Sequence, residues 1–209
     1  NYTIREEKRP DMPFPIEETP DGTFIMSSKD MCMIEHMPAL IDAGITSFKI
    51  EGRMKSAYYT AVVTNAYRAV IDSYIKDKER YVFDSCWLRE LDSVSHREYC
   101  TGYYFDLPSE NAQTCTMPGY LREKSYLAVC RGYDGASGLA KFEQRNKVKV
   151  GDPVEVISPG LPGRGFTGQR MTDSEGNPVE SAPHPFMEFF IPVPFALEEG
   201  DILRSAERE

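Results

Sequence analysis

An acid, a glycine and two bases stand close together at Glu51, Gly52, Arg53 and Lys55, within the stretch SFKIEGRMKS. Glycine lets a ligand approach the backbone, and a helix N-terminus flanked by basic side chains attracts anions. The Glu51 carboxylate could orient Arg53, accept a hydrogen bond from a substrate, or act as a base. The composition predicts an anion or substrate site; the alternative is a salt-bridged helix start without a ligand.

A second candidate for chemistry is the thiol of Cys32, in the stretch SSKDMCMIEHMP. His36 follows one helical turn later, so the two side chains would share a helix face. Thiolate and imidazole both bind metals. A lone helical cysteine is more commonly a small buried apolar group, so this pair alone does not establish a metal site.

The remaining thiols offer no further metal motif. The chain has five cysteines and no CxxC pair: Cys32, Cys86, Cys100, Cys115 and Cys130. His96 and Cys100 are four residues apart, but no second ligand pair accompanies them, and we do not expect a zinc site there. The odd count is typical of a reduced, intracellular chain.

The elements that position these residues alternate between strand and helix. We expect strands at 23–28 and 45–50, a helix over about 29–37 with a further helical piece from Pro38, and a long helix over about 54–76. This order is typical of a parallel α/β sheet, whose ligands bind where strands end and helices begin. Both candidate groups would then open onto the same edge.

The pattern changes after residue 80. Residues 1–80 read as α/β, with an extended arm over 1–22, and residues 81–120 as a connector. Residues 121–209 contain six short β-favouring runs separated by turn signals, which predicts a small antiparallel β-barrel or sandwich. Two βα units cannot cover both faces of a parallel sheet, so we expect a fragment of a larger protein.

Composition excludes some classes. The 209 residues are 41% hydrophobic and carry a net charge of -9, which disfavours indiscriminate phosphate binding. No run is long enough for a membrane helix, and no signal-peptide pattern opens the chain. We expect a cytoplasmic protein with no membrane partner.

One basic cluster stands out in the acidic C-terminal part. It consists of Lys141, Arg145, Lys147 and Lys149. These residues are candidates for RNA contact, although alternating charges on a strand are also typical of a solvated face. His184 lies between two prolines, where a structural hydrogen bond is expected rather than catalysis.

The longer motifs resemble peptidase family U-32, the collagenase-like proteases. The resemblance is carried by residues 27–72, and downstream by TGYYF (101–105), EQRNKVKVGDPVEVISPG (143–160), SAPHP (181–185) and GDILR (200–204). It implies the last units of a TIM-like (β/α) barrel, followed by a small antiparallel β-barrel domain. The cysteine-rich Gly/Ser segment of the family is absent from these residues.

The resemblance also implies chemistry. Some members hydroxylate a tRNA uridine, an rRNA cytidine or a quinone precursor, and they resemble carriers of a [4Fe–4S] cluster, with prephenate associated with the RNA-modifying ones. The family's fourth cluster cysteine corresponds to Cys32, and Glu51, Arg53 and Lys55 would line the barrel mouth, where the two bases suit prephenate or an RNA phosphate. The other ligands would lie upstream, so this chain alone is expected to be inactive.

Three functions follow as alternatives. The first is base hydroxylation of tRNA or rRNA, with an iron–sulfur cluster in the intact protein. The second is a peptidase acting on collagen-like or other extended polypeptides, for which no nucleophilic set is visible. The third, compatible with either, makes the C-terminal barrel a recognition module for RNA or protein.

Overall fold

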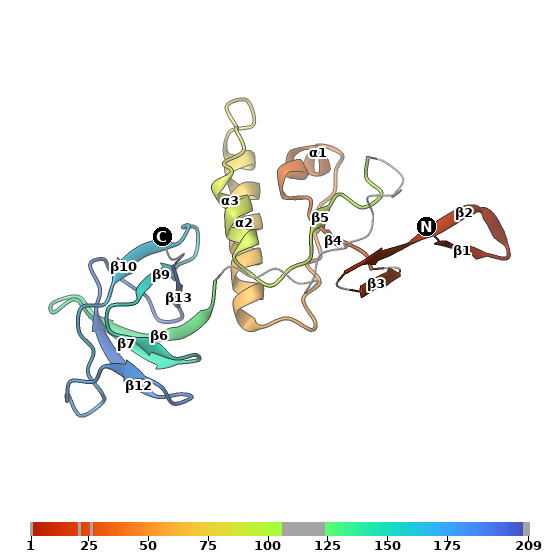
Figure 1. The fold of residues 1–209 in the computed structure, drawn as a ribbon. Coiled ribbons are helices and arrows are strands. Elements are labelled where there is room, and N and C mark those ends of the chain that lie inside the picture. Colours follow the sequence, from red (N-terminus) through yellow and green to blue (C-terminus); the bar gives the residue numbers. More distant parts are fainter. Residues whose placement is uncertain (1, 21, 26, 106–123, 207–209) are drawn as a thin grey trace.

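The computed structural model describes residues 2–20, 22–25, 27–105 and 124–206. Figure 1 shows a β-sheet arm at the N-terminal end, a group of helices in the middle, and a larger β-sheet at the C-terminal end. The chain is therefore mixed α/β, as predicted. No described helix is long and apolar enough to cross a membrane.

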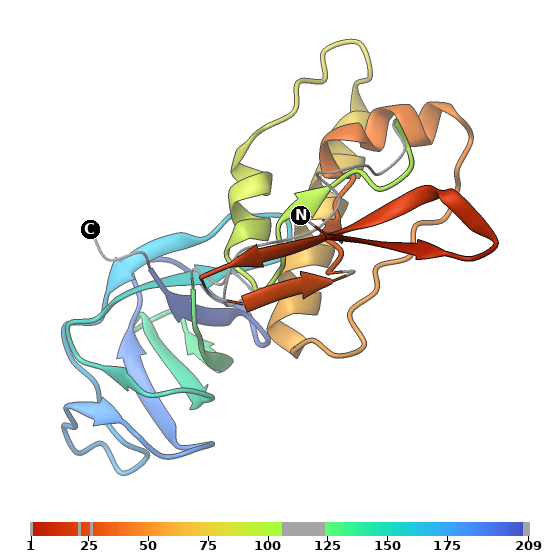
Figure 2. The ribbon, with the colours of Figure 1, turned by 45° about the vertical axis from the view of Figure 1, so that its right-hand side comes forward.

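The arm is a three-stranded antiparallel sheet of β1 (Tyr2–Glu6), β2 (Arg9–Thr19) and β3 (Gly22–Ile25). The strand expected over 23–28 thus exists in part, as β3, but it belongs to no parallel sheet. Only two residues separate it from β2, so it runs back along β2 instead of beside a distant strand. Figure 2 shows the arm from a second direction.

The helix expected over 29–37 is wrong. Residues 30–31 form β4 (Asp30–Met31), which pairs in parallel with β5 (Tyr99–Cys100). The Asp30 amide donates to the Glu98 carbonyl and the Cys32 amide to the Cys100 carbonyl, both at 2.9 Å. This pairing takes up the backbone groups that a helix would use. A 3-10 turn, η1 (Ile34–His36), then leads into α1 (Met37–Asp42).

The strand expected over 45–50 is also wrong. These residues adopt no regular structure, and Ile45 and Ile50 are each 37% exposed. A strand requires a neighbour for its amides and carbonyls, and no described strand pairs with this segment. The only parallel pairing among the described strands is β4–β5, so the TIM-like barrel is not confirmed.

Helix α2 (Ala57–Lys76) confirms the long helical pattern, with a later start than expected. Ser56 is the N-cap, and its hydroxyl accepts from the Tyr59 amide at 3.2 Å. Tyr58, Val62, Ala66 and Val70 fall on one buried face. This face packs against the short helix α3 (Cys86–Asp92), and together they form the core of the central region.

The C-terminal sheet has six strands, each overlapping one run expected to be a strand; of the expected run 166–171 only residues 166–167 are strand. The strands are β6 (Tyr126–Asp134), β7 (Leu139–Gln144), β9 (Pro153–Ile157), β10 (Arg164–Thr167), β12 (Glu188–Pro192) and β13 (Ile202–Ser205). Their order is β10-β9-β13-β6-β7-β12, with every pairing antiparallel. A second pair, β8 (Val148–Lys149) with β11 (Ser181–Ala182), lies beside it. The sheet is a half-barrel, because β10 and β12 remain its two edges.

The sheet packs directly on the helices. Ile157 and Ile202 belong to the same buried cluster as the helix residues. The rings of Tyr58, from α2, and Tyr126, from β6, stack with centroids 5.7 Å apart. Figure 1 shows α2 and α3 between the sheet and the N-terminal arm.

Candidate functional site

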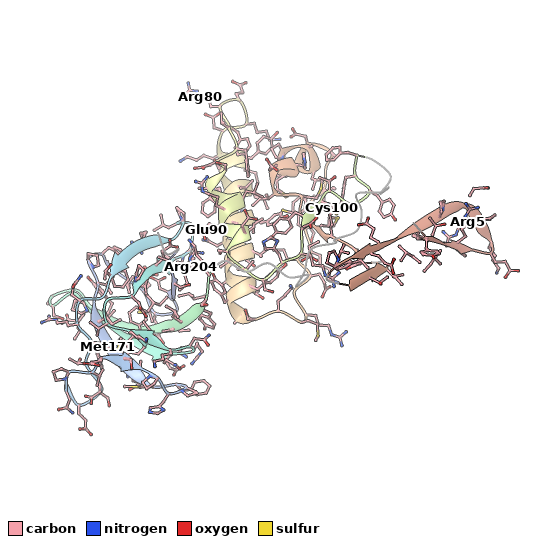
Figure 3. The ribbon with its side chains drawn as sticks, viewed as in Figure 1. Arg5, Arg80, Glu90, Cys100, Met171 and Arg204 are labelled. Carbon is pink, nitrogen blue, oxygen red and sulfur yellow. The ribbon has the colours of Figure 1, made fainter. Side chains whose placement is uncertain are left out.

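A pocket of about 220 Å³ opens beside Cys32. It lies among the end of β4, the turn η1, helix α3 and strand β5. The polar and aromatic side chains that line it are Cys32, Glu35, His36, Asp92, Tyr99, Cys100 and Thr101. Cys100 is labelled in Figure 3. The pocket thus contains the predicted Cys32/His36 pair and a second thiol that was not predicted to accompany it.

Backbone pairing and a tyrosine hydroxyl hold Cys32 in place. Its amide bonds the Cys100 carbonyl, and its Sγ lies 3.7 Å from the Tyr67 hydroxyl. That hydroxyl also accepts from the Met33 amide at 2.9 Å. Burial raises the pKa of the Cys32 thiol, against smaller lowering effects of the Ile34 amide and the Tyr67 hydroxyl. In this structure Cys32 is a protonated thiol at neutral pH.

His36 and His96 lie in different surroundings. His36 faces the pocket, and its ring meets that of Phe105 with centroids 4.5 Å apart. His96 instead stacks on Tyr99 at 4.2 Å, and its Nδ1 lies 2.6 Å from the Arg97 carbonyl oxygen.

The described residues could supply only part of the ligand set of a metal cluster. Nowhere in the described ranges do three His, Cys, Asp or Glu side chains come together in a group that could hold a metal. A [4Fe–4S] cluster needs about four thiolate ligands. Cys32 and Cys100 line a common pocket, and Cys115 lies outside the described residues. Any complete ligand set must draw on other residues.

The Glu51–Lys55 segment is largely exposed. Glu51 forms an exposed ion pair with Lys49 at 3.3 Å, and Arg53 is also exposed. Lys55 donates to the Ser95 carbonyl at 2.7 Å, and its ammonium lies 5.4 Å from the centre of the Tyr59 ring. The segment therefore offers one exposed base, Arg53, and one partly buried base, Lys55.

The ring of Tyr59 lies beside this segment. A Cβ on Gly52 would lie 3.2 Å from the Tyr59 ring, so the glycine allows the loop to approach it closely. Burial raises the pKa of Tyr59, and the negative charge of Asp30, with that of Cys32 once its thiol is deprotonated, raises it further. The Glu51–Lys55 segment thus lies against Tyr59, which packs on the same buried cluster as Cys32.

The C-terminal basic residues differ in their surroundings. Lys141 pairs with Glu188 at 2.6 Å, and Arg145 with Glu143 at 2.5 Å. Lys147 and Lys149 are exposed. Half of the predicted RNA-contact cluster is thus engaged within the sheet surface, and half projects into solvent.

A buried ionic network joins the sheet to the helices. Arg204, on β13, is 1% exposed and donates to both carboxylate oxygens of Glu90, on α3. It also donates to Glu155 at 2.8 Å and to the Ser93 hydroxyl at 2.9 Å. Lys124 donates to Glu155 from the other side at 2.9 Å. Figure 3 shows Glu90 and Arg204 side by side at this interface.

Two family models match consecutive parts of the chain. Residues 1–114 match the model for peptidase family U32, and residues 122–204 match the model for its C-terminal domain. The chain belongs to peptidase family U32.

Curated relatives of this U32 chain carry two kinds of name. The tRNA hydroxylation protein P1 of Bacillus subtilis is 36% identical over 165 residues, 79% of this chain and 39% of the relative. The tRNA hydroxylation protein P of Escherichia coli is 31% identical over 197 residues, 94% of this chain and 43% of the relative. A collagenase of Porphyromonas gingivalis is 28% identical over 140 residues, 66% of this chain and 39% of the relative.

The U32 chain spans well under half of the first two relatives. Among solved structures, it is similar to the C-terminal domain of a U32 peptidase from Geobacillus thermoleovorans. That match has 27% sequence identity and a TM-score of 0.38, and it covers 39% of this chain and 92% of the other.

Sequence reasoning missed two features of this U32 chain. Cys100 enters the pocket because β5 pairs with β4, and two-residue strands leave no periodic signal. Arg204 was seen only as part of the GDILR motif. An arginine between strand residues such as Leu203, in a run of otherwise buried positions, is the signal that could have indicated a buried partner.

Proposed function

We propose that the intact protein hydroxylates a base of tRNA, and that this chain supplies part of the active-site wall and an RNA-contacting sheet. The observation that carries this is the identity of 36% and 31% to two proteins named for tRNA hydroxylation. A ribosomal RNA base is the alternative substrate within the same chemistry. The protein would act in the cytoplasm.

In this proposal Cys32 is one ligand of a [4Fe–4S] cluster whose other ligands lie outside the described residues. The cluster would supply a one-electron redox centre. Support comes from the position of Cys32, whose Sγ lies in a partly buried pocket beside the Tyr67 hydroxyl. Hydrogen bonds and burial are what tune a bound cluster. Metal binding would also have to displace the thiol proton that burial retains.

The two bases near Tyr59 are proposed to hold an anion. Arg53 is exposed, and Lys55 lies at the ring, so both could meet a carboxylate such as that of prephenate, or an RNA phosphate. Glu51 is proposed to orient Arg53 or to contact the substrate. These residues would face the reaction only once the proposed TIM-like barrel, of which this chain holds the last units, is complete.

Nucleoside mass spectrometry of tRNA and rRNA tests the proposal. Cells lacking the gene should lose a hydroxylated nucleoside, and the intact protein should restore it. The Cys32→Ser variant of the intact protein should fail to restore it and should contain less iron and sulfide, while Cys86→Ser should behave as the unaltered protein. An unchanged nucleoside profile in the deletion strain would overturn the proposal.

A peptidase remains the second candidate because of the collagenase-named relative. Cys32 and His36 line one pocket, which is the composition of a thiol peptidase. Against it, burial raises the pKa of the Cys32 thiol, whereas a nucleophilic cysteine needs a lowered one. Cleavage of gelatin by the intact protein, abolished by His36→Ala, would favour the peptidase.

A further inference from the structure

The backbone of Phe186 is unusual. Its φ is 61°, and it is the only residue other than glycine with a positive φ in the described part of the chain. It follows Pro185 in a turn that the Met187 amide closes by donating to the His184 carbonyl at 3.1 Å. Proline then glycine is the usual sequence for such a turn, because a bulky side chain clashes there. Phenylalanine occupies the glycine position.

Packing does not explain the choice of phenylalanine, because the side chain is 67% exposed. The turn is instead held by backbone hydrogen bonds to the end of β7. The Phe186 amide donates to the Gln144 carbonyl at 3.1 Å, and the Gln144 amide donates to the Met187 carbonyl at 3.0 Å. A strained, rigidly held and exposed residue is more typical of a functional site than of a structural one.

Two separate sequence motifs meet at this turn. The basic segment 145–149 runs antiparallel beside the segment 181–187, with Lys149 opposite Ser181 in the β8–β11 pair. The Arg145 guanidinium lies 4.8 Å from the centre of the Phe186 ring. Lys147 and Lys149 are exposed on the same segment, and neither is ion-paired to any residue the structure describes.

The surroundings favour RNA over an apolar protein surface. From residue 124 to 206, the only exposed large apolar side chains are Leu161 and Phe186. Leu161 lies elsewhere, in the loop that contacts Asn65 of α2. A protein-docking patch needs contiguous apolar area, which a single ring does not provide. A single ring beside a guanidinium and free lysines matches an unpaired base and its flanking phosphates.

We propose that Phe186 is a stacking platform for an unpaired base of RNA, with Lys147 and Lys149 contacting the adjacent phosphates. The inference rests on the proposed RNA substrate and adds the place and manner of contact. Arg145 holds the ring from one side, and its pairing with Glu143 keeps the guanidinium in position. The fixed backbone presents the ring without a backbone ordering cost on binding.

The Phe186→Gly variant separates binding from stability. Glycine accepts a positive φ, so the unfolding midpoint of the whole 209-residue chain should stay close to that of the unaltered chain. Affinity for a fluorescein-labelled single-stranded oligoribonucleotide should fall roughly tenfold, as expected for one lost base stack. The Phe186→Trp variant should keep the affinity, and its fluorescence should be quenched on binding. Leu161→Ala is the matched control and should change neither the RNA affinity nor the unfolding midpoint.

Duplex RNA and salt complete the test. The unaltered chain should prefer the single strand over the same sequence in a duplex, and Phe186→Gly should reduce this preference. The double variant Lys147→Gln/Lys149→Gln should lower the slope of log affinity against log salt by about two. Equal binding by Phe186→Gly and the unaltered chain, or a collapsed unfolding midpoint, would overturn the stacking role while leaving the RNA proposal standing. No RNA binding by the unaltered chain at low salt would overturn this inference, and an unchanged nucleoside profile in the deletion strain would overturn the proposed function separately.

Discussion

Arg204 on β13 donates two hydrogen bonds to the Glu90 carboxylate on α3, from Nη1 at 2.7 Å and from Nη2 at 2.8 Å. The two residues are 114 positions apart in the chain, and both are buried. A bidentate pair of this kind fixes orientation as well as distance. The pair therefore sets how the C-terminal sheet sits on the helices.

Replacing Arg204 by Met should reduce the free energy of unfolding by about 3 kcal/mol, because the buried Glu90 would lose its cationic partner and Glu155 would keep only Lys124. Urea denaturation measures this. Arg68→Met is the matched control, since Arg68 pairs with Asp72 on an exposed helix face and should contribute less than about 1 kcal/mol. Equal losses in the two variants would show that the Arg204 pair is not specially stabilising.

Stability should fall in acid because of Glu90. Burial raises the pKa of Glu90, but the hydrogen bonds and charge of Arg204 and the Gly163 amide outweigh it and hold the pKa below its usual 4.5. The stabilisation is thus complete above pH 4.5 and is lost as pH falls through the lower folded value. The free energy of unfolding, followed from pH 6 to pH 3, should decline less steeply in Glu90→Gln than in the unaltered chain. Parallel curves would contradict the assignment.

Asn65 should form a second link between helix α2 and the C-terminal sheet region. Its side-chain oxygen accepts from the Gly160 amide at 2.7 Å, and its nitrogen donates to the Leu161 carbonyl at 3.0 Å. Asn65→Ala should cost about 1 to 2 kcal/mol and accelerate hydrogen exchange at the Gly160 amide. Asn65→Asp keeps the acceptor, so it should largely preserve protection of that amide. Fast exchange in both variants would mean that the amide is protected by other means.

The Cys32 thiol should react slowly. Because burial raises its pKa, iodoacetamide at pH 8 should alkylate it more slowly than it alkylates the thiol of a short peptide. Tyr67→Phe removes a hydrogen bond that lowers this pKa, so alkylation should slow further. Mass spectrometry of the Cys32 peptide gives the rate, and alkylation in urea provides the reference for full access. Faster alkylation in Tyr67→Phe would show that the hydroxyl restricts access more than it stabilises thiolate.

Local patterns in the sequence predicted the elements in which buried residues recur at a regular helical or strand spacing. Helix α2 follows its apolar spacing, and β7 alternates buried and half-buried residues along LAKFEQ. The other C-terminal runs also formed strands, although their burial does not always alternate: Ile202, Leu203 and Arg204 in β13 are all buried. Their turns carry the glycine and proline signals that separate strands.

Predictions failed where pairing with a distant segment decides the structure. Residues 30–31 favour helix locally, yet pair with residues 99–100, and no local signal specifies that partner. Residues 45–50 have a strand composition but no described neighbour to pair with. The Cys32–Cys100 proximity and the Arg204–Glu90 pair are consequences of such long-range packing, so spacing could not predict them. The same holds for the meeting of segments 145–149 and 181–187 at Phe186.

Strand β13 is the last that the structure describes, yet it lies in the middle of the sheet, between β9 and β6. During synthesis the two flanking groups of strands must therefore wait for residues 202–205 before they can join. A premature stop codon upstream of β13 would leave these two groups without the strand that pairs with both, and the Glu90 carboxylate without Arg204. The strand that completes the sheet and the arginine that binds Glu90 are thus synthesised within the same four residues.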